Sequence, residues 1–262
     1  MRPTTRCANA LWALLALLLA GCAAQPEVRR EAAHGEFADE TLRVGLATRV
    51  YRLVVPTSVD LARPAPLVVA FHGMLIDSKD TMPKYTRLNE TAARHGFIIA
   101  YPNAIGGSWG LTLDKVLGDV AFFDALLSRL AATYRIDPDR VYVLGMSNGG
   151  YFAHLVARER SSVIAAAASH SGPLGLQTLG GINAPRKFPV LIVHGTADGI
   201  FPVTVARENV DKYRREGHEA SYIEVPGLGH AWASDANINE RIWAFFAAHP
   251  RSNPAALIKR TQ

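Results

Sequence analysis

The sequence predicts an α/β fold in which a mostly parallel sheet carries helices on both faces. Short, fully apolar segments recur along the chain and alternate with segments of helical periodicity. The composition is 49% hydrophobic and 19% charged, which suits a large core and excludes a disordered chain or a coiled coil. A length of 262 residues is common for a single domain of this class.

The first predicted strands are short and apolar. Residues 50–55 alternate weakly, and residues 67–71 form a fully apolar run that ends at His72 and Gly73, as in a buried strand. A helix is predicted over residues 86–95, closed by Gly96. The buried strand at residues 97–101 is stopped by Pro102.

The middle of the chain continues the alternation. Residues 114–134 form one face of an amphipathic helix, whose apolar positions are spaced by three and four: Val116, Val120, Phe123, Leu127, Leu130 and Tyr134. A turn at residues 137–139 precedes a strand at 141–144. A helix over 151–160 and a strand over 163–168 follow.

The last part repeats the pattern once more. Strands are predicted at residues 190–193 and 220–225, Pro202 opens a helix that reaches residue 216, and a closing helix covers 233–248. In a parallel sheet of this kind, chemistry is expected at the carboxyl ends of the strands.

The charge and cysteine content exclude several other classes of protein. Lys and Arg number 28 against 23 Asp and Glu, and no basic block of the nucleic-acid-binding type occurs. The two cysteines, Cys7 and Cys22, are too few for a disulfide scaffold and lie in no metal-binding spacing. We therefore expect no metal, no cofactor and no nucleic-acid partner; the oligomeric state stays open.

The N-terminal residues are predicted to be an export signal. Arg2 and Arg6 precede an apolar stretch at residues 11–20 that is too short to span a membrane stably. Residues 19–22, Leu-Ala-Gly-Cys, resemble the lipobox of bacterial lipoproteins, in which cleavage precedes the cysteine and its thiol is acylated. We expect residues 1–21 to be a signal peptide and Cys22 to anchor the protein at the cell envelope, at the outer membrane or its periplasmic face. An ordinary signal peptide with an incidental cysteine is the alternative.

The segment after Cys22 is expected to be a flexible tether over residues 22–42. It is polar, lacks periodicity and contains Pro26 and Gly35. Residues 43–262 are then assigned to one α/β domain.

The sequence Gly145-Met146-Ser147-Asn148-Gly149 follows the predicted strand 141–144 and precedes a helix. A G-x-S-x-G at a strand–turn–helix junction presents its serine as an exposed nucleophile, and the flanking glycines avoid collisions in the sharp turn. A glycine-rich turn that only packs or binds phosphate is the alternative, but the G-x-G-x-x-G spacing is missing. Ser147 is therefore the predicted nucleophile.

A serine nucleophile needs a base, which needs an orienting acid, in the chain order Ser, Asp or Glu, His. His230 is the predicted base because its loop follows the last strand, where a mobile imidazole can reach the serine. Asp198, in the loop after strand 190–193, is the predicted acid. Asp211 and Asp235 are interpreted as helix-surface or cap residues.

The remaining histidines after Ser147 are interpreted as structural. His154 lies in a helix and His249 ends one. His170 and His194 follow strands, but with either of them as the base the order Ser, acid, His is left incomplete. His218 lies in a charged turn and is expected to be solvated.

Two backbone N–H groups are expected to bind the oxyanion of a tetrahedral intermediate. One belongs to Asn148, directly after the nucleophile, and the other to Met74, in the loop after strand 67–71. His72 is expected only to pack at the strand end. The sequence leaves two roles open for Trp109 and Trp232: packing in the core or at the rim, or forming a flat apolar wall for the substrate.

Residues 136–150 resemble the polyhydroxybutyrate depolymerase family of α/β-hydrolases, which also holds feruloyl and acetylxylan esterases. Further matches span about residues 50–248: His72-Gly73, Tyr101-Pro102, Ser108-Trp109, residues 194–198 and residues 229–232. The resemblance implies an α/β-hydrolase fold with Ser147, Asp198 and His230 as its triad. The chain departs from the family at Gly118-Asp119-Val120, where the family often has Asp-Asp-Val, in a reduced Gly-rich run around His230, and at Met74, where a cysteine is frequent.

The expected activity is carboxylic ester hydrolysis through an acyl-enzyme, on short-chain or hydroxyalkanoate-type esters. Only about twenty residues separate strands 163–168 and 190–193, so we expect no large lid and an open site. Without a second domain, attack on a crystalline polyester is not expected. The alternatives are a feruloyl or acetylxylan esterase, a prolyl-oligopeptidase-like serine peptidase without the usual propeller, and a non-catalytic binding lipoprotein.

Overall fold

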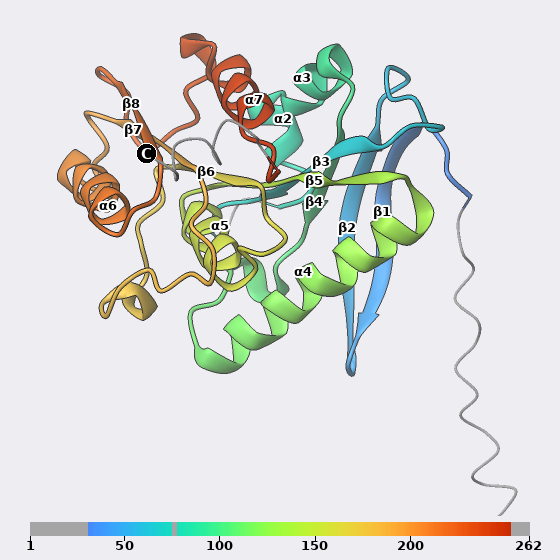
Figure 1. Ribbon diagram of the computed structural model, residues 1–262, viewed down its shortest axis with the longest axis horizontal. Coiled ribbons are helices and arrows are strands. Elements are labelled where there is room, and N and C mark those ends of the chain that lie inside the picture. Colours follow the sequence, from blue (N-terminus) through green and yellow to red (C-terminus); the bar gives the residue numbers. More distant parts are fainter. Residues whose placement is uncertain (1–30, 75–77, 253–262) are drawn as a thin grey trace, which may run out of the picture. The chain divides into compact units, whose positions relative to one another are not determined.

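The computed structural model describes residues 31–74 and 78–252, in which eight strands form one sheet (Figure 1). The sheet order is β1-β2-β4-β3-β5-β6-β7-β8. The strands are β1 (Gly35–Val44), β2 (Ala47–Val55), β3 (Ala65–Phe71), β4 (Ile98–Pro102), β5 (Ile136–Met146), β6 (Ala166–His170), β7 (Val190–Gly195) and β8 (Ala220–Val225). Strand β2 pairs antiparallel with β1 and β4, and every other pairing is parallel. The predicted mostly parallel sheet is confirmed.

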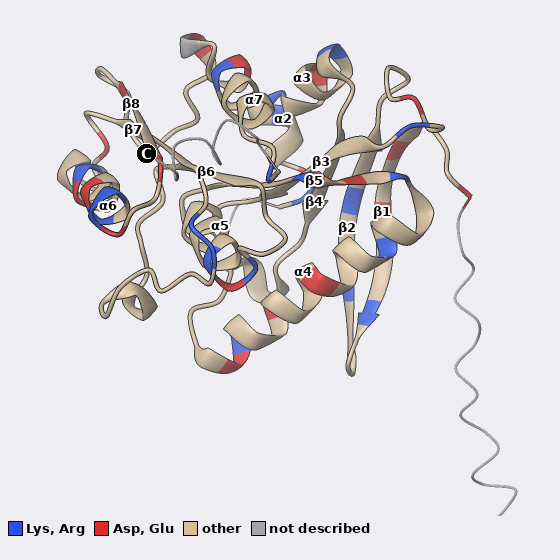
Figure 2. Cartoon of the chain, viewed as in Figure 1, with Lys and Arg blue, Asp and Glu red and all other residues tan. Residues whose placement is uncertain are grey.

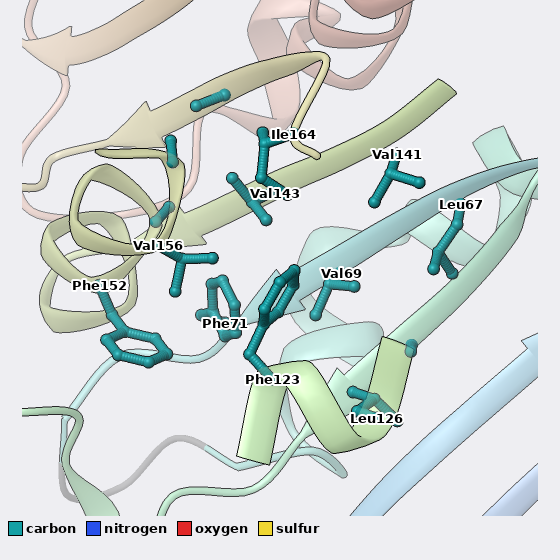
Figure 3. Close-up of a cluster of buried hydrophobic side chains, with 14 of the residues drawn as sticks. Leu67, Val69, Phe71, Phe123, Leu126, Val141, Val143, Phe152, Val156 and Ile164 are labelled. Carbon is teal, nitrogen blue, oxygen red and sulfur yellow. The ribbon is translucent and has the colours of Figure 1, made fainter. Parts of the chain in front are cut away.

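Helices cover both faces of this sheet, because the central strands are apolar on both sides. Leu67, Val69 and Phe71 of β3 pack in one core with α4 (Leu113–Thr133), α5 (Asn148–Glu159) and α6 (Val203–Arg215) (Figure 3). Val68 and Ala70 point the other way, into a second core with α2 (Met82–Thr86), α3 (Leu88–His95) and α7 (Ile238–Ala248). Three short 3₁₀ turns complete the elements: η1 (Ile105–Gly107), η2 (Leu176–Thr178) and η3 (Ser234–Ala236).

Strand β1 corrects the predicted tether, which was expected to reach residue 42. The strand pairs with β2 from Gly35↔Val55 to Val44↔Ala47 and belongs to the unit that begins at Ala32. Because only one of its ten side chains is buried, its sequence shows no buried apolar face. The predictions for residues 1–30, including the signal peptide and the acylation of Cys22, lie outside the described residues.

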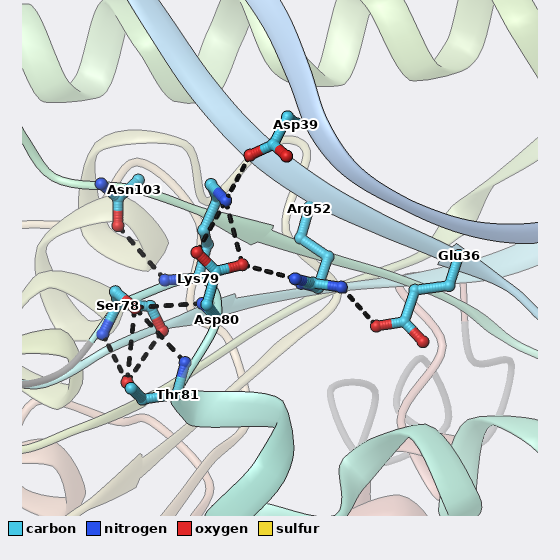
Figure 4. A network of polar contacts seen from close by, with 8 residues as sticks. All are labelled: Glu36, Asp39, Arg52, Ser78, Lys79, Asp80, Thr81 and Asn103. Atoms are coloured by element: carbon cyan, nitrogen blue, oxygen red, sulfur yellow. Dashed lines mark hydrogen bonds and ion pairs between the residues drawn. The ribbon is translucent and has the colours of Figure 1, made fainter.

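A polar network attaches β1 to the rest of the domain (Figure 4). Arg52 of β2 contacts Glu36 of β1 and Asp80, each at 2.5 Å, and Lys79 contacts Asp39 of β1 at 2.8 Å. Burial opposes ionisation of Asp80, but hydrogen bonds from Lys79 and Arg52 outweigh it and lower the pKa of this carboxyl. Glu36 and Asp39, which lie in the segment expected to be a tether, therefore hold an edge strand in place.

Local backbone geometry corrects several predicted element boundaries. The helix predicted over 86–95 begins two residues later, as α3, because Arg87 has a left-handed φ of 56° and separates it from the preceding short helix α2. The closing helix is divided in the same way at Asn237, with φ 49°. Strand β5 begins at Ile136, so the predicted turn at 137–139 is part of that strand, and β6 lies two to three residues later than expected.

Charged residues of both signs are interspersed over the helices and outer strands (Figure 2). No helix in the described part of the chain is both long and apolar enough to cross a membrane.

Candidate active site

The turn between β5 and α5 carries Ser147 in a strained conformation, with φ 54° and ψ −120°. The two flanking glycines are required by space. A Cβ on Gly145 would lie 2.0 Å from the carbonyl oxygen of Gly149, and a Cβ on Gly149 would lie 2.1 Å from that of Phe71. The sharp turn predicted from G-x-S-x-G is therefore present, and it places Ser147 at the carboxyl edge of the sheet.

Ser147, His230 and Asp198 form one hydrogen-bonded chain. His230 Nε2 lies 2.9 Å from Ser147 Oγ, and His230 Nδ1 lies 2.8 Å from Asp198 Oδ2. An ionised carboxylate only accepts, so Nδ1–H donates to Asp198 and Nε2 is left to accept the serine proton. The structure brings these three predicted residues together from the ends of β5, β7 and β8, which lie 32 to 83 residues apart in the chain.

The environment of Asp198 keeps its carboxyl ionised. Burial of this side chain opposes the charge, but the N–H groups of Phe201 and Ile200 and the imidazole of His230 donate to it and lower its pKa below the ordinary value. Both N–H groups bind Oδ1 at 2.9 Å, which leaves Oδ2 for His230. The carboxylate is therefore fixed at both oxygens.

Two further histidines lie beside this chain. His194 Nε2 donates to the carbonyl oxygen of Phe201 at 2.8 Å and lies 3.5 Å from Asp198 Oδ2. His170 accepts from the N–H of Ala233 at 3.2 Å, and burial lowers the pKa of His170 to about 3. A neutral His170 adds no positive charge next to His230.

His218 corrects a sequence prediction, because it is buried rather than solvated. Its imidazole packs against the rings of Phe188 and Tyr213 and contacts the backbone of Phe188. Burial lowers the pKa of His218.

The two residues predicted to supply oxyanion donors lie in different segments. Asn148 begins α5, and its buried side chain is held by the backbone of Trp109: Trp109 N–H donates to Oδ1 at 2.6 Å, and Nδ2 donates to the Trp109 carbonyl at 3.1 Å. Met74 follows β3 and is exposed. His72 lies between β3 and Met74 and is buried, where its Nε2 accepts from the N–H of Ala104 at 3.0 Å.

Trp109 and Trp232 do not form the predicted wall for the substrate. Trp109 has no exposed surface, since its ring stacks on Phe152 at 4.9 Å and its Nε1 donates to the His72 carbonyl at 3.0 Å. Trp232 is 6% exposed and stacks on His170 at 4.8 Å. Both indoles are structural supports of the site, so packing, and not substrate contact, is the role that the structure gives them.

Sequence reasoning missed residues that contact the site from its rim and from beneath it. Phe201 lies beside His230, with ring centroids 5.8 Å apart, and the neighbouring Ile200 is exposed. Their position two and three residues after Asp198 was the available signal. Arg49 and Asp119 form a buried ion pair at 2.8 Å, and Asp119 also binds Gly110, next to Trp109. The two residues lie 70 positions apart in the chain, so no local sequence pattern predicts their contact.

No group of three or more His, Cys, Asp or Glu side chains in residues 31–74 and 78–252 is arranged to hold a metal ion. The hydrogen bonds from Asp198 through His230 to Ser147 provide a serine hydroxyl beside an oriented imidazole.

The mostly parallel sheet and the serine at the β5–α5 turn define the α/β-hydrolase class of fold. The family model of esterase PHB depolymerase matches residues 49–186, more than half of the chain. The chain therefore belongs to the PHB depolymerase esterase family. The match includes Ser147 and ends before Asp198 and His230.

Relatives that are described as esterases support this family assignment. The chain is 32% identical over 172 residues to a bifunctional acetylxylan esterase/xylanase of Neocallimastix patriciarum, covering 63% of this chain and 24% of that protein. It is 33% identical over 122 residues to feruloyl esterase B of Neurospora crassa, covering 43% and 40%. The chain thus spans less than half of the length of either relative.

A solved structure shares the fold. The ferulic acid esterase of Anaeromyces mucronatus superposes with a TM-score of 0.64 at 19% identity, over 87% of this chain and 96% of that one.

Proposed function

We propose that this protein is a serine ester hydrolase that uses Ser147 as nucleophile, His230 as general base and Asp198 as the orienting acid. The observation that carries the proposal is the hydrogen-bonded chain from Asp198 through His230 to Ser147, with steps of 2.8 and 2.9 Å. Membership of an esterase family supports the same reaction class.

The geometry fits a two-step acyl transfer. Ser147 Oγ attacks the ester carbonyl carbon while His230 Nε2 takes the hydroxyl proton. The tetrahedral intermediate then expels the alcohol, which receives that proton from the imidazolium, and the acyl group remains on Ser147. Water repeats the sequence on the acyl-enzyme, so that the acid is released and Ser147 regains its proton.

The developing oxyanion would be bound by the backbone N–H groups of Asn148 and Met74. The N–H of Asn148 lies at the N-terminus of α5, where unpaired backbone donors favour negative charge. Asn148 cannot turn its side chain to the substrate, because both amide atoms bond to Trp109. Donation by the backbone is the role left to it.

Short-chain or hydroxyalkanoate-type esters are the proposed substrates. The connection between β6 and β7 holds only the short turn η2, which supports an open site. Exposed apolar side chains follow the carboxyl ends of four strands, namely Met74, Ile105, Leu176 and Ile200. Exposed apolar side chains at this edge of the sheet suit a small apolar acyl group better than a charged one.

Acetyl or feruloyl esters of plant polysaccharides are the second candidate. The names of the relatives favour them, since acetylxylan and feruloyl esterases are among the proteins that this chain resembles. The burial of Trp109 and Trp232 removes the aromatic wall that the sequence offered for a feruloyl ring.

The test compares wild type with Ser147→Ala on p-nitrophenyl acetate and butyrate, methyl ferulate, acetylated xylan and a peptide anilide. We expect ester hydrolysis by wild type, labelling of Ser147 by a fluorophosphonate, and loss of both in the variant. Unchanged ester turnover in Ser147→Ala would refute the proposal. Faster hydrolysis of the anilide than of any ester would favour the peptidase alternative.

Anchoring by an acylated Cys22 is part of the proposal, supported by the Leu-Ala-Gly-Cys sequence at residues 19–22. Cys22→Ser should abolish labelling of the protein by palmitate in a bacterial host and release it from the membrane fraction. A fully processed Cys22→Ser protein that still fractionates with membranes would contradict the anchor.

A further inference from the structure

Arg49 and Asp119 form an ion pair that is almost wholly buried, at 3% and 2% exposure. Arg49 Nη2 donates to Asp119 Oδ1 at 2.8 Å, and the guanidinium lies 4.1 Å from the ring centre of Phe122. Arg49 comes from β2 and Asp119 from α4. A buried charge pair of this kind is costly to desolvate, so its presence is weak evidence that it stabilises the fold. Its other hydrogen bonds point to a different role.

The second oxygen of Asp119 holds the loop that precedes α4. Its Oδ2 accepts from the N–H of Gly110 at 2.9 Å. On the other side of the same loop, the hydroxyl of Tyr151 donates to the Gly110 carbonyl at 2.7 Å. Gly110 has a φ of 38°, and the Trp109–Gly110 segment is thus fixed from α4 and from α5.

The Trp109–Gly110 segment connects both predicted oxyanion donors. The backbone of Trp109 makes two hydrogen bonds with the side chain of Asn148, whose N–H is one donor. The indole Nε1 of Trp109 donates to the carbonyl oxygen of His72, two residues before Met74, which carries the other. A shift of Trp109 would therefore disturb both donors at once.

We propose that Asp119, which Arg49 holds in place, is a positioning residue for the oxyanion site, and that its side-chain oxygen acts through the hydrogen bond from Gly110 and through Trp109. Neither residue touches the substrate. The proposal rests on the proposed function, because it assigns these residues to the transition state of that reaction. Donors that are misplaced by a fraction of an ångström stabilise the transition state less while leaving ground-state binding almost unchanged.

Two double variants isolate the acceptor for Gly110 without leaving an unpaired buried charge. Arg49→Gln/Asp119→Asn keeps a side-chain oxygen for the Gly110 N–H, and Arg49→Gln/Asp119→Ala removes it. With p-nitrophenyl butyrate, we expect the Asn variant to retain kcat within about threefold of wild type. The Ala variant should lose at least about tenfold in kcat, approaching the range measured for lost oxyanion donors, with KM changed less than about threefold.

A second readout follows the same transition state. The rate constant for fluorophosphonate labelling of Ser147 should fall by the same factor as kcat in the Ala variant and recover in the Asn variant. Asp124→Asn is the matched control: Asp124 also lies on α4 and pairs with an arginine, Arg160, but makes no described contact with Trp109 or Gly110. Its kcat should stay within about twofold of wild type.

Equal kcat in the two double variants would overturn the proposal. A loss of kcat in Asp124→Asn as large as that in the Ala variant would also overturn it. If a double variant does not fold, Tyr151→Phe tests the same segment from its other side, and kcat should fall about threefold at constant KM; an unchanged kcat there would also overturn it. Loss of activity in Ser147→Ala keeps the proposed function intact whichever way these variants behave.

Discussion

Ser147 shows how a single residue is held by the elements around it. Its N–H donates to the carbonyl oxygen of His170 at 2.8 Å, and its carbonyl accepts from the N–H of Tyr151 at 2.9 Å. These bonds from β6 and α5 maintain a φ of 54°, which a non-glycine residue adopts only at a cost of about 1–3 kcal/mol. The position of the hydroxyl is thus built into the sheet edge instead of being left to a mobile loop.

The hydrogen bonds of Asp198 predict a severe effect of Asp198→Asn on kcat. The N–H groups of Ile200 and Phe201 would hold the oxygen of the substituted amide, so that its NH₂ group faces His230 Nδ1. This arrangement favours the tautomer with a proton on Nε2, which cannot accept the proton of Ser147. We expect kcat to fall on the order of 10⁴-fold, as in serine proteases, with the fold intact by circular dichroism.

Asp211→Asn in α6 is the control for this prediction, because Asp211 is exposed and the hydrogen bonds described for His230 go to Asp198 and Ser147 instead. A loss of less than about tenfold in Asp198→Asn would mean that Asp198 does not set the tautomer.

At the scale of elements, glycine positions separate close packing from free space. A Cβ on Gly149, at the start of α5, would lie 2.1 Å from the carbonyl oxygen of Phe71 and 2.5 Å from that of His72. Gly118 lies inside α4, and a Cβ there meets nothing within 4 Å. We expect Gly149→Ala to lower the free energy of unfolding by about 3 kcal/mol and to abolish activity. Gly118→Ala should raise it by about 0.5–1 kcal/mol.

Urea unfolding of the two variants measures both effects. Equal stability of Gly149→Ala and wild type would show that β3 and α5 are not packed as closely as described.

The contact between α5 and α6 makes the fold sensitive to acid. His154 is buried against Tyr213, and burial lowers the pKa of His154 from 6.5 to about 4, although a backbone hydrogen bond at Gly172 opposes the shift. Between these two values the unfolded chain binds a proton that the folded chain does not, so stability falls as the pH falls. The slope is about 1.4 kcal/mol per pH unit for this one group.

His154→Gln should remove most of this slope while keeping a partner for the Tyr213 hydroxyl. The measurement is the free energy of urea unfolding at about pH 4.5 and about pH 7.5, on either side of most of this interval. We expect the difference between these values to be smaller in the variant by about 2–3 kcal/mol. An unchanged difference would place the acid sensitivity elsewhere.

Particular elements show what the sequence could predict. The strands β3, β4 and β7 are continuous apolar runs, because both of their faces are covered, and such runs are visible locally. The candidate nucleophile, acid and base could be predicted because each follows a strand and because they occur in the diagnostic order Ser147, Asp198, His230. Strand β1 was missed because an edge strand needs little apolar surface. The burial of Trp109, His218 and the Arg49–Asp119 pair depends on contacts between distant segments, which no window of sequence contains.

At the scale of the whole molecule, one edge of the sheet gathers the site and an apolar rim. The loops after β5, β7 and β8 supply Ser147, Asp198 and His230. The exposed side chains of Met74, Ile105, Leu176 and Ile200 come from the loops after β3, β4, β6 and β7. The connection between β6 and β7 holds only the short turn η2.

The short connection between β6 and β7 predicts a preference for short acyl chains. Each buried methylene contributes about 0.8 kcal/mol only where protein covers it, and exposed rim residues leave a long chain largely in water. We expect kcat/KM to be highest for acetyl to butyryl esters and to fall by octanoyl, with no increase in rate above the solubility limit of the substrate. The measurement is kcat/KM for p-nitrophenyl esters of two to twelve carbons. A maximum at ten or twelve carbons would require a covered apolar tunnel. A flat, weak profile would instead mean that the alcohol or aryl side is recognised, which would favour the polysaccharide-ester candidate.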